Sequence, residues 1–493
     1  MQLSPLQLTR GYNLLVLLLS LGSFGGYGQS SRYDIRQHFD GLYAGYGDTT
    51  PGAAVLVVEG DSILFAEGYG TANLEYGIPV DTGTVFQVAS ISKQFTAFAV
   101  YLLAADGLIG LEDAAGQYLP ELTQFAPAIR VDHLLSHTSG LKDHLALLTF
   151  AGWRMDEYVD NDQILRLVAR QRELNFAPGS AFRYSNTNYV LLAELVERVS
   201  GMSLDAFLRE RVFEPLGMDH TQFYDDHERL IPHRAYGYDF AAGRFKKEAL
   251  NNSYVGSTGL FTTAADLAKW SANFYDPVVG DPALIATFNA ATTLDNGSPA
   301  YADEQLGIRH AKGQFLREYR GLTSFIHTGS DGGFRAFLGR WPARRLTVIL
   351  LSNDARFAPY PNGFGFAERY LEPVLGPYAT FTPPVASPSG EKVAKPKAPL
   401  TPEAITGTYH SDELDSTFDL RFVDGKPLLS HFRLGDIPLR TDGKGGFSGV
   451  NWYSFTVDFP RGADGRVTGM EIVDFRGERL RFERMEEATA TER

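Results

Sequence analysis

Two residues in the first quarter of the chain, Ser90 and Lys93, have the types and the spacing of a nucleophile and its proton partner. At positions i and i+3 of a helix, their side chains lie on one face. The helix N-terminus and burial both disfavour the charged form of the lysine, so its amine can accept the serine proton. The spacing alone does not decide the matter, because a second S-x-x-K match, Ser389 to Lys392, falls in a proline-rich segment.

Two further motifs supply what such a pair needs, namely a second proton carrier and donors for an oxyanion. Tyr184 and Asn186 form a Y-x-N triplet just ahead of a strongly apolar segment. His327 to Gly329 form an H-T-G triplet where a strand-like pattern runs into glycines. The order S-x-x-K, Y-x-N, H-x-G, with each motif at the boundary of an expected element, is much harder to obtain by accident than any single match.

The elements expected around these motifs are strands at both ends of a long region, with helices between them. Residues 53–60 and 62–70 predict a hairpin around Gly60 and Asp61. After Ser90, apolar residues at helical spacing predict a helix that ends at Gly107. The runs FLGRW and LTVILLSND are strand-like again, which predicts one sheet assembled from both ends of the region.

Composition divides the 493 residues into four segments. Residues 1–28 combine Arg10, a short apolar run and small residues, which predicts a cleaved signal peptide and a soluble product in a periplasm or outside the cell. Residues 32–376 hold the strand and helix patterns, and residues 377–400 are typical of a proline-rich linker. Residues 401–486 show period-two runs broken by Asp-Gly pairs, which predict an antiparallel β-domain.

Charge and composition restrict the partners and cofactors. The formal net charge of −14 disfavours nucleic acid and anionic lipid, and the first apolar run is too short for a stable membrane anchor. The chain has no cysteine, zinc-ligand spacing or phosphate-cradling glycine loop, so we expect no metal and no other cofactor. Asp132, His133 and Asp143 are typical of a solvated loop, and His137 of a structural histidine that fixes a turn before Gly140.

The chain resembles the serine β-lactamase-like hydrolases, which include class C β-lactamases, D-Ala-D-Ala carboxypeptidases, D-aminopeptidases and related esterases. The resemblance covers residues 41–375 and rests on the three motifs together with HLLSHTSGL, FEPLGM and GSTGLFTTAADLAKW. It implies an α/β fold, an antiparallel sheet flanked by helices with an inserted helical subdomain. Residues 407–430 resemble, more weakly, a lipocalin-like β-barrel that follows this domain in some members. That barrel is expected either to select substrates or only to stabilise the protein.

The resemblance also implies the roles of the reacting groups. Ser90 is expected to be the nucleophile and Lys93 its proton partner. Tyr184 is expected to be the general base that also serves deacylation, although a tyrosine at the start of a helix can be purely structural. The backbone N–H groups of Ser90 and Ser330 are expected to form the oxyanion hole.

Substrate binding is implied for Asn186, which would orient an amide or ester, and for His327 and Gly329 of the H-T-G triplet. His327 stands where many β-lactamases have the lysine of K-T-G, and a histidine is mostly neutral near pH 7. A permanent cation suits the carboxylate of a β-lactam or a C-terminal D-alanine. The histidine therefore favours esterase, amidase or D-aminopeptidase activity. Structural roles for Asn186 and His327 stay open as alternatives.

The sequence thus predicts an exported, metal-free serine hydrolase that cleaves a small-molecule ester or amide, or a peptidoglycan-like peptide, through an acyl-enzyme on Ser90. The alternatives are a β-lactamase, a catalytically silent protein that binds cell-wall fragments, and a structural envelope protein. A catalytically silent protein is disfavoured by the presence of Ser90, Lys93 and Tyr184, because binding needs no nucleophile. The sequence specifies neither the physiological substrate nor the oligomeric state.

Overall fold

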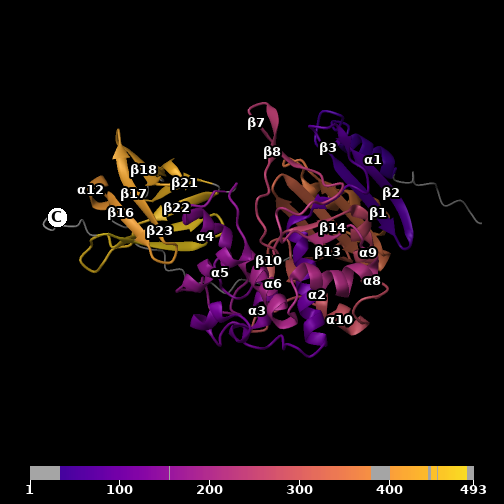
Figure 1. Ribbon diagram of the computed structural model, residues 1–493, viewed down its shortest axis with the longest axis horizontal. Coiled ribbons are helices and arrows are strands. Elements are labelled where there is room, and N and C mark those ends of the chain that lie inside the picture. Colours follow the sequence, from indigo (N-terminus) through magenta and orange to yellow (C-terminus); the bar gives the residue numbers. More distant parts are fainter. Residues whose placement is uncertain (1–33, 155, 379–399, 442–445, 452, 486–493) are drawn as a thin grey trace, which may run out of the picture. The chain divides into compact units, whose positions relative to one another are not determined.

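A computed structural model describes residues 34–154, 156–378, 400–441, 446–451 and 453–485 of the protein (Figure 1). The predicted signal peptide and most of the predicted linker lie outside these described residues. Within them, no helix combines the length and the apolar character needed to cross a membrane. The described chain is organised around two main hydrophobic cores. The larger core lies in residues 34–376, called the catalytic region because it holds the predicted site residues, and the other lies mainly in residues 401–485, the C-terminal region.

The first core is built on an eight-stranded sheet in which each pair of neighbours is antiparallel. The hairpin expected around Gly60 is confirmed, and the first strand pairs along its whole length with a strand from the far end of the region. The prediction of one sheet assembled from both ends is therefore also confirmed. In spatial order the strands are β10 (Tyr301–Asp303), β11 (Ile308–Ala311), β12 (Gln314–Tyr319), β13 (Leu322–Asp331), β14 (Phe334–Trp341), β15 (Leu346–Ser352), β1 (Ala53–Glu59) and β2 (Ser62–Tyr69).

Helices cover both faces of this sheet (Figure 1). On β15, Ile349 and Leu351 belong to the larger core, whereas Phe337 of β14 contacts Gly363 on the other face. Because both faces are buried, the strand LTVILLS is buried at every position and contains four consecutive apolar residues rather than an alternating pattern. The helices that contact the sheet are α1 (Ile35–Leu42), α9 (Ala264–Ala272) and α11 (Pro359–Leu371), and the two longest helices, α2 (Ser92–Ala105) and α6 (Asn186–Ser200), belong to the larger core.

The helical subdomain predicted by the resemblance lies between α2 and α6, which pack against each other. Its helices are α3 (Val131–Leu135), α4 (His144–Phe150) and α5 (Asn161–Arg170). Further short elements complete the region, namely α7 (Leu204–Leu208), α8 (Glu214–Leu216), α10 (Pro282–Phe288), β3 (Thr71–Asn73), β4 (Ile78–Pro79), β5 (Phe86–Gln87), β6 (Gln222–Phe223), β7 (Gly237–Ala241), β8 (Arg244–Glu248) and β9 (Leu260–Thr262). The fold is therefore the expected α/β fold, with an antiparallel sheet flanked by helices.

The C-terminal region is a nearly closed, nine-stranded antiparallel barrel. The Asp-Gly pair at Asp424 and Gly425 makes the predicted tight turn, with φ angles of 49° and 74°. The barrel core also takes in Leu147 and Phe150 of α4, so the barrel shares its core with the catalytic region. Its elements are α12 (Pro402–Ile405), β16 (Gly407–Ser411), β17 (Ser416–Val423), β18 (Lys426–His431), β19 (Gly435–Pro438), β20 (Arg440–Thr441), β21 (Phe447–Val450), β22 (Ser454–Asp458), β23 (Gly469–Asp474) and β24 (Arg479–Arg484).

Candidate active site

The predicted pair lies at the start of α2, where a 3-10 turn, Ala89–Ile91, runs into the helix. Ser90 is half-buried, whereas Lys93 is fully buried. The Nζ of Lys93 donates to the Oγ of Ser90 at 3.1 Å. It also donates to Asn186 Oδ1 at 2.8 Å and to the backbone oxygen of Ser257 at 2.6 Å. The structure thus brings three of the predicted site residues into direct contact.

Burial lowers the pKa of Lys93 from its ordinary 10.5 to about 7. The nearby carboxylate of Asp143 opposes this shift and the guanidinium of Arg476 reinforces it. In its neutral form the amine keeps two N–H donors for Asn186 and Ser257, and its lone pair is left for the proton of Ser90. The geometry and the pKa therefore suit proton transfer from the serine near neutral pH.

The turn that carries Ser90 is held in a backbone conformation that residues other than glycine rarely adopt. Ala89 has a φ of 48°, which costs a non-glycine residue about 1–2 kcal/mol. Gln87 holds it there by accepting from the Ala89 N–H at 2.8 Å, while Ser92 Oγ donates to the Ala89 oxygen at 2.5 Å. The amide of Gln87 is in turn fixed by the carboxylate of Asp331 at 2.8 Å. No sequence motif pointed to Gln87 or Asp331.

Tyr184 lies directly beside the pair. The Ser90 side chain interacts with its hydroxyl and partly opposes the rise in the pKa of Tyr184, and Lys93 Nζ lies 4.9 Å from its ring centroid. Burial raises the pKa of Tyr184 well above its usual value, so its hydroxyl is protonated near neutral pH. Behind it, the ring of His137 packs at 4.4 Å, and His137 Nδ1 accepts from the Ser185 N–H at 3.2 Å. His137 adopts a φ of 56° in its turn and supports the tyrosine segment.

Asn186 occupies the first position of α6 with both ends of its amide engaged. Its oxygen accepts from Lys93, while its backbone N–H and its Nδ2 donate to Asp143 Oδ2 at 2.7 and 2.9 Å. Asp143 is fully buried, so the expectation of a solvated loop at Asp143 is wrong. His133, with 2% exposure, is buried as well. A polar residue outside a regular element looks solvated in the sequence, but the carboxylate of Asp143 accepts hydrogen bonds from buried donors of α6.

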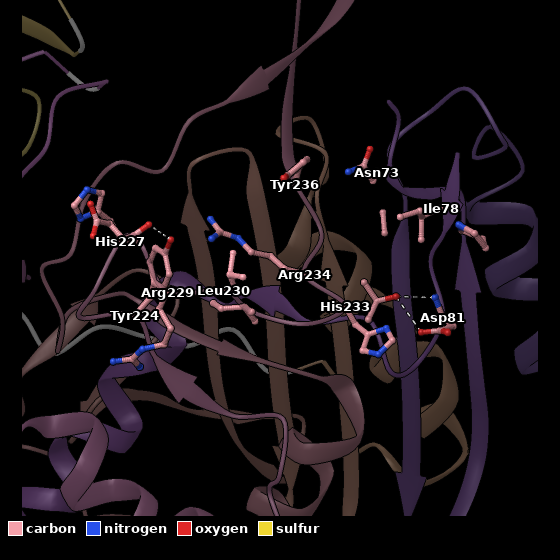
Figure 2. A pocket seen from close by; sticks show the side chains of 15 residues that line it. Asn73, Ile78, Asp81, Tyr224, His227, Arg229, Leu230, His233, Arg234 and Tyr236 are labelled. Carbon is pink, nitrogen blue, oxygen red and sulfur yellow. Dashed lines mark hydrogen bonds between the residues drawn. The ribbon is translucent and has the colours of Figure 1, made fainter. Parts of the chain in front are cut away.

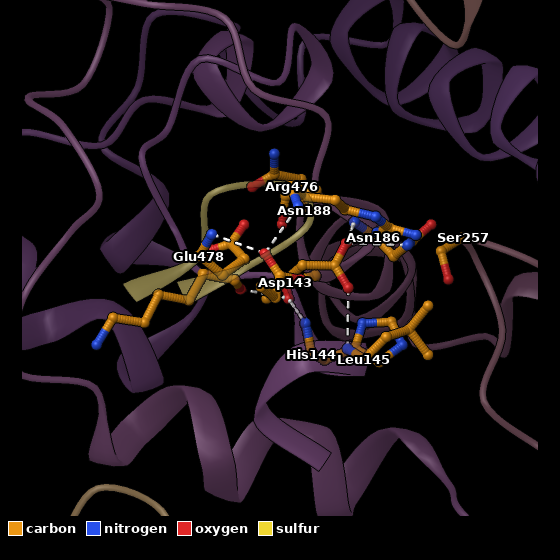
Figure 3. A network of polar contacts seen from close by, with 12 residues as sticks. Asp143, His144, Leu145, Asn186, Asn188, Ser257, Arg476 and Glu478 are labelled. Atoms are coloured by element: carbon orange, nitrogen blue, oxygen red, sulfur yellow. Dashed lines mark hydrogen bonds and ion pairs between the residues drawn. The ribbon is translucent and has the colours of Figure 1, made fainter. Parts of the chain in front are cut away.

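A further partner of Asp143 comes from the barrel, where Arg476 Nη1 lies 3.0 Å from its Oδ2 (Figure 3). Arg476 follows β23, 333 residues beyond Asp143 in the chain. No motif pointed to Arg476, since the segment DFRGER is typical of an ordinary turn between two strands. Only the packing of the barrel against the catalytic region brings them together.

The H-T-G triplet lies on β13, whose pairing with β12 ends at Ile326. From His327 onward, no strand of the described residues pairs with the edge of β13 that faced β12. This part of the strand packs against the turn of Ser90. A Cβ on Gly329 would lie 2.2 Å from the backbone oxygen of Val88, so only glycine permits this approach. Ser330 follows on the same strand and is exposed.

His327 is buried on this strand, with its ring stacked on Phe315 at 4.9 Å. Burial and the charge of Lys93 lower the pKa of His327 to about 3, so the ring is neutral near pH 7. Its Nδ1 lies 2.6 Å from the backbone oxygen of Thr328, which can only accept, so the proton sits on Nδ1. Its Nε2 is therefore an acceptor, and it has no hydrogen-bond partner among the described residues.

A pocket lies elsewhere in the catalytic region (Figure 2). Its lining includes Asp81, Tyr224, His233 and Arg234, and none of the predicted site residues belongs to it. In the parts of the chain that the structure covers, no group of three or more His, Asp or Glu side chains is arranged to hold a metal ion.

Comparison with known proteins identifies the family. A sequence profile described as Beta-lactamase matches residues 36–363. A penicillin-binding protein of Bacillus subtilis is 30% identical over 344 residues, which are 66% of this chain and 73% of that protein. A D-aminopeptidase of Gluconobacter oxydans is 28% identical over 305 residues, or 62% of this chain. The match spans 56% of that D-aminopeptidase.

Solved structures show the same fold. An octameric penicillin-binding protein homologue from Pyrococcus abyssi aligns with a TM-score of 0.60 and 20% identity, over 91% of this chain and all of that one. A D-amino acid amidase from Ochrobactrum anthropi aligns with a TM-score of 0.56 and 23% identity, over 68% of this chain and 97% of that one. The profile covers well over half of the chain. The chain therefore belongs to the Beta-lactamase family of serine hydrolases.

Proposed function

We propose that the protein cleaves an ester or amide bond through an acyl-enzyme formed on Ser90. The observation that carries this proposal is the buried amine of Lys93, 3.1 Å from Ser90 Oγ, with its pKa lowered to about 7. A buried lysine that is about half neutral at pH 7 can act as a base, whereas an ordinary lysine, almost fully charged at that pH, cannot. This arrangement is the one that activation of a serine requires.

The proposed acylation step starts with the neutral amine of Lys93. Ser90 Oγ attacks the substrate carbonyl while its proton passes to Nζ, and the carbonyl oxygen becomes an oxyanion. The tetrahedral intermediate then collapses, and the leaving alcohol or amine takes up a proton. The hydroxyl of Tyr184, which interacts with the Ser90 side chain, can hand on this proton and be reprotonated from Lys93.

Deacylation reverses the sequence with water as the nucleophile. Water gives up a proton through Tyr184 to Lys93 and attacks the ester carbonyl on Ser90. The tetrahedral intermediate then collapses, Lys93 Nζ returns the proton to Ser90 Oγ, and the acid is released with the free serine. Because the pKa of Tyr184 is raised, the tyrosine acts here as a relay that never accumulates as phenolate. Lys93 is then the group that stores the proton in both halves of the reaction.

The backbone N–H groups of Ser90 and Ser330 are proposed to stabilise the oxyanion. The support for this assignment is the edge of β13 beside the Ser90 turn, with which no described strand pairs from His327 onward, and the glycine at 329 that lets the two segments approach. Removing one such donor usually costs about 10²–10³ in rate, so the assignment is open to measurement.

The substrate is proposed to be a neutral ester or amide, with amides of D-amino acids as leading candidates. His327 offers a neutral ring and an acceptor nitrogen, which favour an N–H or O–H group over a carboxylate. Relatives described as D-aminopeptidases support amide substrates of this kind. With the first segment acting as a signal peptide, the enzyme would work in a periplasm or outside the cell.

A substrate panel tests the proposal. D-amino-acid amides, short p-nitrophenyl esters, D-Ala-D-Ala peptides and a chromogenic cephalosporin would be compared for the wild type and for Ser90→Ala. We expect turnover of amides or esters that Ser90→Ala abolishes while its circular dichroism stays unchanged. A wild type that binds these compounds without turning any of them over would instead favour the silent binding protein.

A further inference from the structure

A turn of the C-terminal barrel is hydrogen-bonded to the segment that leads to Tyr184 and Asn186. This turn, residues 475–478, joins β23 to β24. Arg183, which precedes Tyr184 in the chain, donates from Nη1 to the backbone oxygen of Gly477 at 2.7 Å. On the other side, Asn175 Nδ2 donates to the buried carboxylate of Glu478 at 2.5 Å. The turn is therefore fixed at two points beside the reacting groups.

Between these anchors, Arg476 reaches into the site itself (Figure 3). Its Nη1 contacts Asp143 Oδ2 at 3.0 Å, and the Asp143 side chain is only 1% exposed. The same oxygen accepts from the backbone and the side chain of Asn186, whose own oxygen accepts from Lys93 Nζ. Three consecutive polar contacts thus connect the barrel to the amine that contacts Ser90.

We propose that Arg476 is a positioning residue of the hydrolytic site, and that the barrel completes this site by supplying it. The inference rests on the proposed function. Asp143 must stay ionised to hold both N–H groups of Asn186, and a buried carboxylate requires a cation or several donors. Arg476 supplies that cation, so it fixes Asn186 and, through Asn186, the position of Lys93.

Arg476 also acts on Lys93 through its charge. Its guanidinium lowers the pKa of Lys93, while the carboxylates of Asp143 and Asp331 raise it. Removing the cation while Asp143 stays ionised raises the pKa of Lys93, so a higher pH is needed to free the amine. Other titratable groups that interact with Lys93, Asp143 or Arg476 are His137, His144, His310, His327, Tyr184, Tyr254, Tyr453, Asp474 and Glu478.

The test compares Arg476→Met with Arg481→Met in the full-length enzyme. Arg481 lies in the same hairpin and pairs with Glu173 at 2.8 Å, but both side chains are more than half exposed. For a p-nitrophenyl ester, Arg476→Met should lower kcat/KM by up to about 100-fold, the effect of misplacing a reacting group by about 1 Å. The acid limb of its pH profile should move to higher pH, and Arg481→Met should match the wild type in both respects.

Two further variants keep the test valid if Arg476→Met folds poorly. Arg476→Lys keeps the charge and should recover part of the activity. Combining Arg476→Met with Asp143→Asn leaves no unpaired buried charge, and its kcat/KM should be no lower than that of Asp143→Asn alone, because the two residues act as one unit.

Three results would overturn the inference. The first is a folded Arg476→Met enzyme with wild-type kcat/KM, and the second is a reduced kcat/KM with an unmoved acid limb. The third is a double variant whose loss equals the product of the two single losses. An inactive wild type would instead overturn the proposed function and this inference with it, so the two failures are distinguishable.

Discussion

Acylation by the enzyme should be switched on by the loss of one proton from Lys93. Its pKa is lowered from 10.5 to about 7, so about half of the amines are neutral at pH 7. An unperturbed lysine would be neutral in only about 0.03% of molecules at that pH, so burial raises the population of the base about a thousandfold. At pH values below the pKa of Lys93, on the acid limb of the pH profile, kcat/KM for a neutral ester should fall about tenfold per pH unit.

Glu478, a second buried group, titrates in the same pH range as Lys93. Burial, together with the charge of Asp143, raises the pKa of Glu478 to about 7 as well. Glu478→Gln removes this titration and keeps an oxygen that can accept from Asn175. We therefore expect Glu478→Gln to retain the acid limb, because the limb belongs to Lys93.

The assay is kcat/KM for a p-nitrophenyl ester from about pH 5 to about pH 9, in the wild type, in Glu478→Gln and in Lys93→Arg. Lys93→Arg keeps a permanent cation and loses the base, so its rate should fall by about 10²–10⁴. A profile that stays flat down to the lowest pH would refute the role given to Lys93. So would a limb that disappears in Glu478→Gln.

The remaining predictions concern single groups of the site. Tyr184→Phe should leave thermal stability nearly unchanged and slow deacylation by about 10²–10⁴, seen as accumulated acyl-enzyme in intact mass spectra; ester turnover near the wild-type rate would make the tyrosine structural. His327→Lys should raise the kcat/KM ratio of an acid to its methyl ester about ten- to a hundredfold, and a wild type that already prefers the acid would contradict a neutral recognition site. Gly329→Ala places a Cβ 2.2 Å from the Val88 oxygen and should abolish turnover, whereas Gly365→Ala in α11, with nothing within 4 Å, should raise the melting temperature slightly.

Much of the fold followed from local patterns in the sequence. The hairpin around Gly60 and the strands of the C-terminal region were predicted because alternation and Asp-Gly turns act over a few residues. The order of the three motifs likewise indicated which segments meet around Ser90. These predictions depend on short-range preferences, which a single sequence displays.

The residues that hold the site residues in place could not be predicted from such local patterns. Asp143 was placed in a solvated loop, yet it is buried because donors of α6 and of the barrel converge on it. Arg476 and Gln87 carry no motif, and their roles arise from contacts across more than 150 residues of chain. Such contacts depend on how the elements pack, and a polar residue in a turn gives no sign of them.

Covalent labelling tests the central claim most directly. The full-length protein would be treated with a fluorophosphonate, and the adduct would be weighed by intact mass spectrometry and located by peptide mapping. The account predicts one adduct, on Ser90, that is absent in Ser90→Ala. A wild type that forms no adduct, or an adduct that persists in Ser90→Ala, would contradict the assignment of Ser90 as the nucleophile.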